Sequence, residues 1–424
     1  MKQLNSRIQR ATRGTLGSYV IIACITLFAL ILRLLYIPFA LHYDPYLVQD
    51  PLFGDGRDYD AIGLNLCKGN GFADQAGEPT SRRAPVYPAF LALVYCTVGH
   101  NLLLVRISQA FMGAGLVFVV FLIARRFYGA GCALLAASIM ALHPIAVYFG
   151  AFIGTESLFL LILCITFLAA ISIADRPSVP RLFMLGVLQG IAALARPQVV
   201  LYWPVLPAWI FFIKRREPLR RAVAQWLVVV LVSLLTILPW TVRNYRVHKA
   251  LVLIDTHGGW TLYGSYGISN HGEFVPRWDA AAKGLSEYQQ DKLYYQLAFQ
   301  LIGDHPLRAV QLIPEKVARL LSPIAAVDKE YPVRWAGIAK VLYAIFLVFA
   351  LIGVIFSTLQ WRDSFLLYAN ILITLFTTAI FYGCTRFSLP MQPALVIFAG
   401  LSIVRLTASL VGKIARQQPK TSVV

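Results

Sequence analysis

Charged residues are scarce in this sequence: Asp, Glu, Lys and Arg make up only 14% of the 424 residues, whereas hydrophobic residues make up 58%. The mean hydropathy is +0.67, and apolar runs of about 20 residues, the length that crosses a bilayer, recur along the chain. This composition excludes an ordinary soluble domain. It predicts an all-α fold, a polytopic bundle of transmembrane helices.

Acidic residues are also few: the chain has 20, against 38 lysines and arginines, which gives a net charge of +18. The basic residues separate the apolar runs and form no single patch, which argues against a nucleic-acid partner. The six cysteines include no C-x-x-C pair, and all but Cys67 lie in or beside apolar runs, where a thiol usually acts as a small hydrophobic side chain. A disulfide between Cys67 and Cys96 stays open, although nothing in their spacing supports it.

Ten apolar segments are predicted to cross the membrane. They cover residues 19–40, 102–124, 130–151, 157–174, 182–195, 198–213, 222–240, 337–359, 364–382 and 389–411. The first segment follows a basic stretch and no small-x-small cleavage site comes after it, so we expect an uncleaved signal anchor. The fifth and sixth segments are short for spans, because Arg196 and Pro197 separate them.

Two polar stretches interrupt the apolar segments, at residues 41–101 and 241–336. We predict one transmembrane domain over residues 1–411, with these stretches as its two large outer loops, and a cytoplasmic tail over residues 412–424. Within the first loop, residues 86–98 are apolar but too short to cross the bilayer, which predicts an interfacial helix.

The loops between the predicted spans differ in charge from one membrane face to the other. On the face that carries both termini, the short loops contain Arg125, Arg126, Arg176, Arg181, Arg362 and five basic residues at 214–221. The opposite short turns hold almost no lysine or arginine, and only three of the 20 acids lie on the termini's face. By the positive-inside rule the termini are cytoplasmic, and both large loops, with any active site, face outward from a cytoplasmic (inner) membrane.

The first outer loop is the leading candidate for an active site. Five acids fall within residues 50–74, and a chain with so few charges has few other places for polar chemistry. Asp55 stands four residues before Tyr59, whereas Asp58 falls within the short helical pattern around Tyr59, where an acid at a helix start is common. Arg33, in the preceding span, is an intramembrane cation that needs a partner.

Polar and charged residues also mark the outer ends of later spans. They are Glu156, Arg196, Arg243, Asn244 and Arg386. Cations at these positions oppose the positive-inside rule unless they bind something anionic, and the planar fork of donors on arginine suits phosphate. Glu156 has several open roles in its sharp turn: it orients an acceptor, holds a metal, pairs with an arginine, or is an acid at a helix N-terminus.

Residues 305–322 predict an amphipathic helix that lies at the membrane interface. Its cations are Arg308, Lys316 and Arg319. Two interpretations stay open: these cations contact phosphate directly, or they snorkel from a helix that anchors the loop to the membrane.

Six groups of short motifs occur in the order found in the GT-C superfamily of membrane glycosyltransferases. They are D-x-x-x-Y-x-x-x-G-x-x-L-x-x-G-x-G-F at 55–72 with P-x-Y-P at 85–88, T-E at 155–156, A-R-P at 195–197, P-W-x-x-R-N-Y at 239–245, G-G-x-x-L-x-G at 258–264, and R-F-x-x-P-x-x-P at 386–393. The chain therefore resembles this superfamily over about residues 20–395, in particular the bacterial relatives of protein mannosyltransferases and the lipid A aminoarabinose transferase.

The resemblance implies packed transmembrane helices around an outward-facing cavity. It implies transfer of a sugar, with inversion, from a polyprenyl-phosphate donor to a lipid, glycan or protein acceptor, in contact with membrane lipids. Asp55 would be the catalytic base and Glu156 a second catalytic residue, with the donor phosphate on Arg386 and, less firmly, on Arg243 and Arg196. The other residues expected to contact substrate are Arg33, Asp58, Tyr59, Arg83, Asn244 and Lys316.

A divalent cation stays open as a cofactor, and its ligands are unknown. Members of the superfamily often have two adjacent acids in the first loop, whereas here Gly56 follows Asp55 and the next acid is Asp58.

Two other functions also stay open. A flippase for lipid-linked glycans would be helical and basic too, but it needs no outward base and usually shows internal repeats, which this sequence lacks. A polysaccharide polymerase or ligase shares the donor and the side of the membrane, but it typically concentrates arginines in one outer loop. The loop at 241–336 instead balances its basic residues with acids such as Asp255 and Asp279.

Overall fold

The computed structural model describes residues 2–267, 270–322 and 336–417. Every named element in this part of the chain is a helix, and the only β-type pairing described is an isolated bridge between Ala73 and Pro79. The predicted all-α fold is therefore confirmed.

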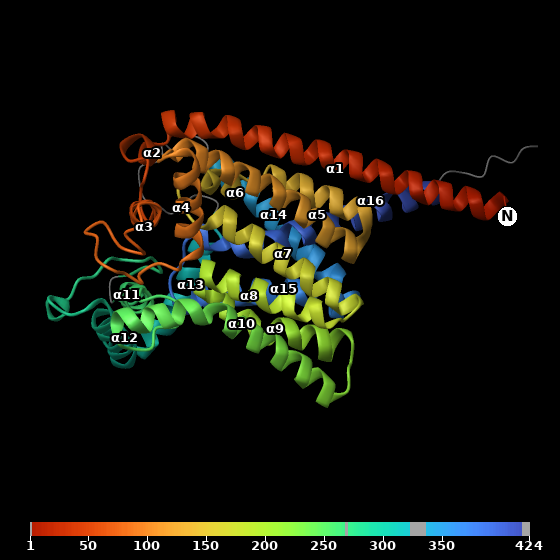
Figure 1. Cartoon of the computed structure of the whole chain (residues 1–424). Helices are drawn as coiled ribbons and strands as arrows, with labels where there is room; N and C mark the ends of the chain where they lie inside the picture. Colours follow the sequence, from red (N-terminus) through yellow and green to blue (C-terminus); the bar gives the residue numbers. More distant parts are fainter. Residues whose placement is uncertain (1, 268–269, 323–335, 418–424) are drawn as a thin grey trace, which may run out of the picture.

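Long apolar helices form the body of the molecule (Figure 1). α1 (Lys2–Tyr43), α5 (Leu102–Ala141), α7 (Glu156–Asp175), α10 (Leu219–His248) and α16 (Gln392–Gln417) run roughly along one common direction. Six stretches of the described chain are long and apolar enough to cross a membrane: Leu16–Tyr43, Leu102–Ala141, Glu156–Asp175, Leu219–His248, Gly337–Ile380 and Thr385–Leu410. The chain is a multi-pass membrane protein.

Two of these six stretches contain a break, so their number differs from the ten predicted segments. Gly129 interrupts α5 with a φ of +83°, which favours glycine. η4 (Thr358–Gln360) separates α14 (Ala336–Ser357) from α15 (Trp361–Ile380).

Short helices make up all or part of two predicted segments. The segment predicted at 130–151 comprises the end of α5 and α6 (Pro144–Gly150), because Pro144 cannot continue the preceding helix. The segment at 198–213 consists of η1 (Pro197–Leu201), α9 (Tyr202–Ala208) and η2 (Trp209–Lys214).

α8 (Val179–Ala195), the helix before them, packs closely on α10 through two glycines. A Cβ added to Gly186 would lie 2.6 Å from Cβ of Val232, and one added to Gly190 would lie 2.5 Å from Cβ of Thr236. Small residues four apart let two helix backbones approach within a membrane, where packing drives association.

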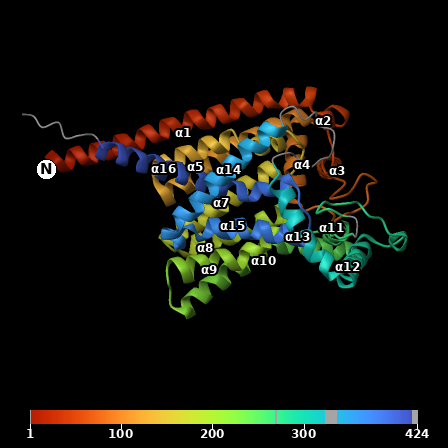
Figure 2. The same cartoon turned by 180° about the vertical axis from the view of Figure 1, so that it is seen from behind.

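The shorter helices gather at one end of the bundle, and both described chain ends lie at the other (Figures 1 and 2). These helices are α2 (Pro45–Gln49), α3 (Gly56–Cys67), α4 (Val86–Val98), α11 (Gly258–Ser265), η3 (Ala280–Ala282), α12 (Glu287–Asp304) and α13 (Pro306–Leu320). The prediction that both termini share one side of the bundle agrees with this arrangement. The two predicted outer loops share the opposite end.

The helices predicted within these loops form with nearly the expected bounds. The short apolar helix at 86–98 is α4, which lies across the end of the bundle (Figure 1). The amphipathic helix is α13, with Leu307 and Val310 exposed and Leu312 and Leu320 buried. Residues 323–335 of the second loop lie outside the described residues, as do residues 418–424 of the predicted tail, whose residues 412–417 continue α16.

A disulfide joins α3 to α4, between Cys67 and Cys96, whose Cα atoms are 5.4 Å apart. Their spacing in the sequence gave no support for this bond. Gly63 makes the approach of the two helices possible, since a Cβ there would lie only 2.7 Å from Cβ of Leu91. The first outer loop is thereby held as one packed unit.

Candidate active site

Three carboxylates and three arginines alternate at the loop end of the bundle, and we call this set the charge chain. In order of contact its members are Asp58, Arg83, Asp55, Arg386, Glu156 and Arg196. Arg83 Nη2 lies 2.8 Å from both Asp55 Oδ1 and Asp58 Oδ2, and Arg386 Nη1 lies 2.9 Å from Asp55 Oδ2. The Nε of Arg386 and a terminal nitrogen of Arg196 both donate to Oε1 of Glu156.

The charge chain joins segments that are far apart in the sequence. Asp55 directly precedes α3, Glu156 is the first residue of α7, and Arg386 belongs to η5 (Thr385–Met391). Six of the residues predicted to form the site therefore lie in one continuous network.

The glycines around Asp55 let its loop lie against the turn that carries Glu156. Gly54 has a φ of +70°, and a Cβ on Gly56 would lie 3.2 Å from the carbonyl oxygen of Ile153. The Asp55 side chain caps no backbone N–H of α3, so both of its oxygens are available to the arginines. The side chain is 32% exposed, which leaves it within reach of a ligand.

Glu156 is almost inaccessible, with a side chain that is 4% exposed. The structure is consistent with two of the roles that the sequence left open for Glu156. The residue lies in the first turn of α7, and it pairs with two arginines. Thr155 accepts a hydrogen bond of 2.9 Å from Arg196 Nε, which fixes that guanidinium beside the carboxylate.

The arginines determine the protonation of Asp55. Burial by itself would raise the pKa of Asp55, but the charges of Arg83 and Arg386 outweigh it and hold that pKa well below its usual range. Burial, together with the charge of Arg83, lowers the pKa of the nearby His257 to about 3. Asp55 is therefore an anion beside a neutral imidazole at neutral pH, and a weak base while both arginines contact it.

Tyr59 lies beside the charge chain, buried in α3, and Arg83 is stacked over its ring at 5.3 Å from the centroid. Its ring also packs edge-on against Tyr87 at 5.0 Å. Tyr59 thus supports the position of the Arg83 guanidinium.

Arg243 and Asn244 lie outside the charge chain and fasten the two outer loops together. Arg243 donates to the carbonyl oxygens of Phe72 at 2.7 Å and of Thr80 at 2.6 Å. Asn244 accepts from Ser81 Oγ at 2.8 Å and donates to the carbonyl oxygen of Val252 at 3.2 Å. These contacts hold the first loop on the end of α10.

Arg33, the intramembrane cation expected to need a partner, is bound by backbone carbonyl groups. Its guanidinium donates to the carbonyl oxygens of Ala29 at 3.0 Å and Ala141 at 3.2 Å, and the described residues provide it with no acidic partner. The partner that Arg33 was expected to need is therefore supplied by backbone carbonyl groups of α1 and of the C-terminal end of α5.

Lys316 is buried in α13, and its Nζ lies 3.3 Å from the carbonyl oxygens of Ala379 and Ile380. The Nζ also lies 3.8 Å from the centroid of the Tyr266 ring. Burial lowers the pKa of Lys316 to about 7. The side chain joins α13 to the C-terminal end of α15 and has no contact with the charge chain among the described residues.

Sequence reasoning missed Arg106 and Gln109, which position both catalytic candidates. Arg106 is 2% exposed; its Nε donates to the carbonyl oxygen of Ala151 at 2.8 Å and its Nη2 to that of Pro51 at 2.7 Å. Gln109 donates to the carbonyl oxygen of Phe152 at 2.7 Å. The sequence contained one indication of this role: Arg106 lies inside a predicted span, where a charged residue usually has a function.

Two cavities adjoin the charge chain. The polar cavity, with about 490 Å³ of empty volume, is lined by Asp58, Ile62, Asp74, Gln75, Thr80, Arg82 and Arg83. The aromatic cavity, with about 790 Å³, is lined by Pro197, Gln198, Asp255, His257, Gly258, Thr261, Tyr295, Thr377, Thr378, Phe381 and Phe387. Pro197 and Phe387 directly follow Arg196 and Arg386 in the sequence.

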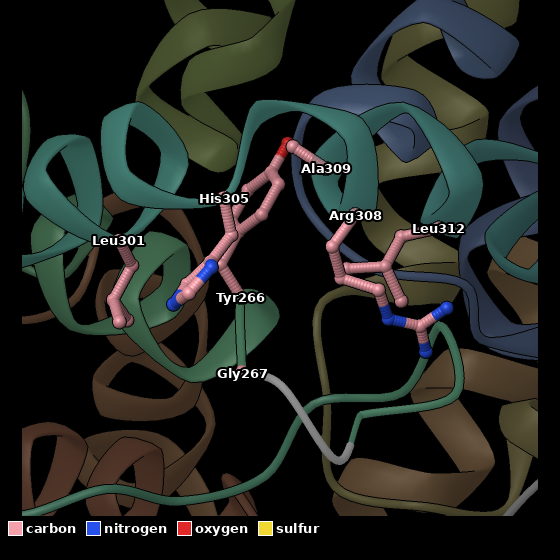
Figure 3. Close-up of a pocket in the computed structure, with 7 residues that line it drawn as sticks. All are labelled: Tyr266, Gly267, Leu301, His305, Arg308, Ala309 and Leu312. Atoms are coloured by element: carbon pink, nitrogen blue, oxygen red, sulfur yellow. The ribbon is translucent and has the colours of Figure 1, made fainter.

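A third cavity, of about 260 Å³, is lined by the two residues that follow α11, by Leu301 of α12 and by the first part of α13 (Figure 3). Arg308 lines it, but its guanidinium already donates to Glu315 at 3.0 Å and to the carbonyl oxygen of Asn270 at 2.5 Å. We therefore do not place substrate in this cavity.

The site does not fit a divalent cation. Within the described ranges, no three His, Cys, Asp or Glu side chains are grouped so that they could hold a metal ion. Both Asp55 and Glu156 already accept hydrogen bonds from arginines, which supply the positive charge at this place.

Residues 82–242, less than half of the chain, match the family described as dolichyl-phosphate-mannose-protein mannosyltransferase. The match includes Arg83, Glu156 and Arg196 of the charge chain and ends just before Arg243. No curated protein matches the sequence.

Solved structures of an archaeal oligosaccharyltransferase share the fold. The Archaeoglobus fulgidus enzyme tethered with an acceptor peptide aligns with a TM-score of 0.55 and 12% identity, over 95% of this chain and 51% of that chain. The enzyme AglB from the same organism, in complex with an inhibitory peptide and a dolichol-phosphate, aligns with a TM-score of 0.55 and 13% identity, over 95% and 52%. ArnT from Cupriavidus metallidurans bound to undecaprenyl phosphate aligns with a TM-score of 0.44 and 15% identity, over 95% and 81%.

The family match and the shared fold confirm the predicted resemblance to membrane glycosyltransferases of the GT-C superfamily. The chain spans about half the length of the oligosaccharyltransferase structures that it matches.

Proposed function

We propose that this protein is a glycosyltransferase that moves a sugar, with inversion, from a polyprenyl-phosphate donor to a lipid, glycan or protein acceptor. The observation that carries the proposal is the contact between Asp55 and Arg386, which joins a carboxylate able to accept a proton to a guanidinium able to bind phosphate. The family match and the likeness to structures that hold a dolichol-phosphate or an acceptor peptide support it.

The donor phosphate would compete with the protein's own carboxylates for the arginines. In our mechanism the phosphate oxygens accept hydrogen bonds from Arg386 and Arg196. In the free protein, these two arginines bind Asp55 and Glu156 instead. When Arg386 turns to the phosphate, Asp55 loses one of the two charges that hold its pKa low, and its affinity for a proton rises. Donor binding thus makes Asp55 a stronger base.

Transfer then takes one displacement. Asp55 accepts the proton of the acceptor hydroxyl while that oxygen forms a bond to the anomeric carbon of the sugar. The bond between this carbon and the phosphate oxygen breaks, and its electron pair stays on the phosphate. Arg386 and Arg196 stabilise the negative charge that develops there. Inversion requires that the base and the leaving group lie on opposite faces of the sugar.

We place the reaction at the outer face of a cytoplasmic (inner) membrane, with both termini in the cytoplasm. The charge difference between the loops supports this orientation, as does the disulfide between Cys67 and Cys96, because disulfides persist mainly outside the reducing cytoplasm. Alkaline phosphatase fused to the C-terminus should be inactive, and fused within the loop near residue 284 it should be active. The reverse pattern would invert the topology.

The test of function uses purified protein and radiolabelled polyprenyl-phosphate sugars, supplied one sugar at a time, with transfer measured in a single turnover. Asp55→Asn keeps the shape of the side chain but removes its basicity, so transfer should fall about 10²- to 10⁴-fold while polyprenyl phosphate still binds. Asp58→Asn is the matched control, because Asp58 contacts Arg83 but not Arg386. Full activity in Asp55→Asn would refute the assignment of the base.

The phosphate site has its own test, the binding of a polyprenyl phosphate without sugar. Arg386→Ala should weaken this binding, and Arg386→Lys should restore it in part, because lysine has the charge but lacks the planar fork of donors. Unchanged binding in Arg386→Ala would remove Arg386 from the phosphate site.

A further inference from the structure

Among the described residues, Asp255 forms no salt bridge with an arginine or lysine. It lines the aromatic cavity, and its carboxylate accepts a hydrogen bond from the backbone N–H of His257. No ion pair to Asp255 occurs among the described residues, whereas Asp55 and Glu156 each contact two arginines. The remaining acceptor capacity of this carboxylate faces the cavity and is available to a ligand.

The wall of the aromatic cavity combines ring faces with neutral polar groups. Phe381 and Phe387 supply the ring faces, and Gln198 and Thr261 supply an amide and a hydroxyl. Tyr295 reaches the cavity past Gly258, since a Cβ at that glycine would lie 2.0 Å from the tyrosine oxygen. Apolar surfaces with a few convergent polar groups suit a small ligand that has both ring faces and hydroxyl groups.

We propose that the aromatic cavity binds the monosaccharide unit of the donor and that Asp255 determines which sugar is accepted, by accepting hydrogen bonds from its hydroxyl groups. This inference rests on the proposed function and names the substrate site within it. The sugar is attached directly to the phosphate, so it must lie beside the arginines that bind the phosphate. Pro197 and Phe387, which adjoin Arg196 and Arg386, both line this cavity.

The polar cavity is the alternative place for the sugar. Its lining includes Asp58, Arg82 and Arg83 but no aromatic side chain, and it adjoins Arg83 instead of Arg196 or Arg386. A sugar there would lack a ring surface and would lie away from the proposed phosphate site. Asp74, which lines only this cavity, is therefore a matched comparison for Asp255.

The experiment measures equilibrium binding of two kinds of probe to the purified full chain. One is a polyprenyl phosphate without sugar; the other is a panel of the same lipid phosphate carrying a hexose, a pentose or an amino sugar. The proteins are the wild type, Asp255→Asn, Asp255→Ala, Asp74→Ala and Asp304→Ala, the last an exposed acid outside both cavities. Thermal unfolding of each variant establishes that it is folded.

We expect the wild type to bind at least one sugar-bearing probe more tightly than the bare lipid phosphate. Asp255→Ala should reduce this preference about tenfold, the size expected for the loss of one or two hydrogen bonds, and should leave binding of the bare lipid phosphate unchanged. Asp255→Asn should shift the order of preference within the panel, because its amide donates as well as accepts. Asp74→Ala and Asp304→Ala should bind like the wild type.

Three results separate this inference from the proposed function. If Asp255→Ala keeps the full preference for sugar, the sugar does not contact Asp255 and the inference fails while the proposed function stands. If Asp74→Ala loses the preference instead, the sugar lies in the polar cavity and the inference also fails. If the wild type binds neither the bare lipid phosphate nor any sugar-bearing probe, the proposed function fails first.

Discussion

Arg106 should matter for turnover as much as the residues that contact substrate, although it lies below the charge chain in α5. One guanidinium fixes Pro51, four residues before Asp55, and Ala151, five residues before Glu156. Arg106→Gln removes at least one of these hydrogen bonds, and Arg106→Ala removes both. The segments that carry Asp55 and Glu156 would then be free to shift relative to each other.

The structure gives the size of the expected effect. Ala151 is buried whereas Pro51 is exposed, so Arg106→Ala leaves one carbonyl oxygen unsatisfied in a buried place and should lower the free energy of unfolding by about 1–3 kcal/mol. A displacement of about 1 Å between reacting groups can cost about 10²-fold in rate. We therefore expect about a 100-fold loss of kcat in the protein that remains folded, with a smaller change in KM.

Arg33 provides the matched control, since it too is a buried intramembrane arginine that donates to backbone carbonyl groups, at Ala29 and Ala141. Arg33→Ala should lower the thermal unfolding temperature by a similar amount but leave kcat per folded molecule close to that of the wild type. The assay is transfer from the radiolabelled donor, normalised to folded protein. Equal kcat losses in Arg33→Ala and Arg106→Ala would refute the positioning role.

Three further predictions concern the same end of the molecule. Glu156→Gln should bind a bare polyprenyl phosphate as tightly as the wild type or more tightly, because a competing anion is gone. Single-turnover transfer by this variant should fall at least about tenfold, and weaker lipid-phosphate binding would contradict the prediction. Burial raises the pKa of Asp255 to about 7 and that of Asp291 to about 6, above the unfolded value of 3.8, so the free energy of unfolding should fall as pH rises from about 4 to about 7. Changing both acids to asparagine should flatten this dependence between about pH 4 and about pH 7, and an unaltered slope in thermal unfolding would disprove the assignment. Replacing Cys67 and Cys96 by serine should cost about 3 kcal/mol of stability, and dithiothreitol should lower the unfolding temperature of the wild type but not of this variant.

The sequence predicted the charge chain better than it predicted the packing beneath it. Asp55, Glu156, Arg196 and Arg386 could be found because each is a polar residue at the end of an apolar segment, and because each belongs to a motif of the superfamily. Their mutual contacts could not be predicted, since nothing in the sequence specifies which helix ends meet.

The partners of the buried arginines were harder to foresee. Arg33 and Arg106 bind backbone carbonyl groups, which no pattern of side chains marks. The sequence showed that Arg33 needs a partner but not which one, and the C-terminal end of a helix supplies the compensating negative charge. The disulfide likewise depends on Gly63, whose role is visible only when α3 lies on α4.

The alternation within the charge chain has a consequence for soluble anions. Its three arginines and three carboxylates carry no net charge, so the charge chain has little electrostatic attraction for inorganic phosphate or nucleotides. A ligand must supply additional binding energy before it can separate the ion pairs. If the donor is a polyprenyl phosphate, as proposed above, its long isoprenoid chain would supply that energy by leaving water, and inorganic phosphate, which lacks such a chain, should bind the charge chain far more weakly.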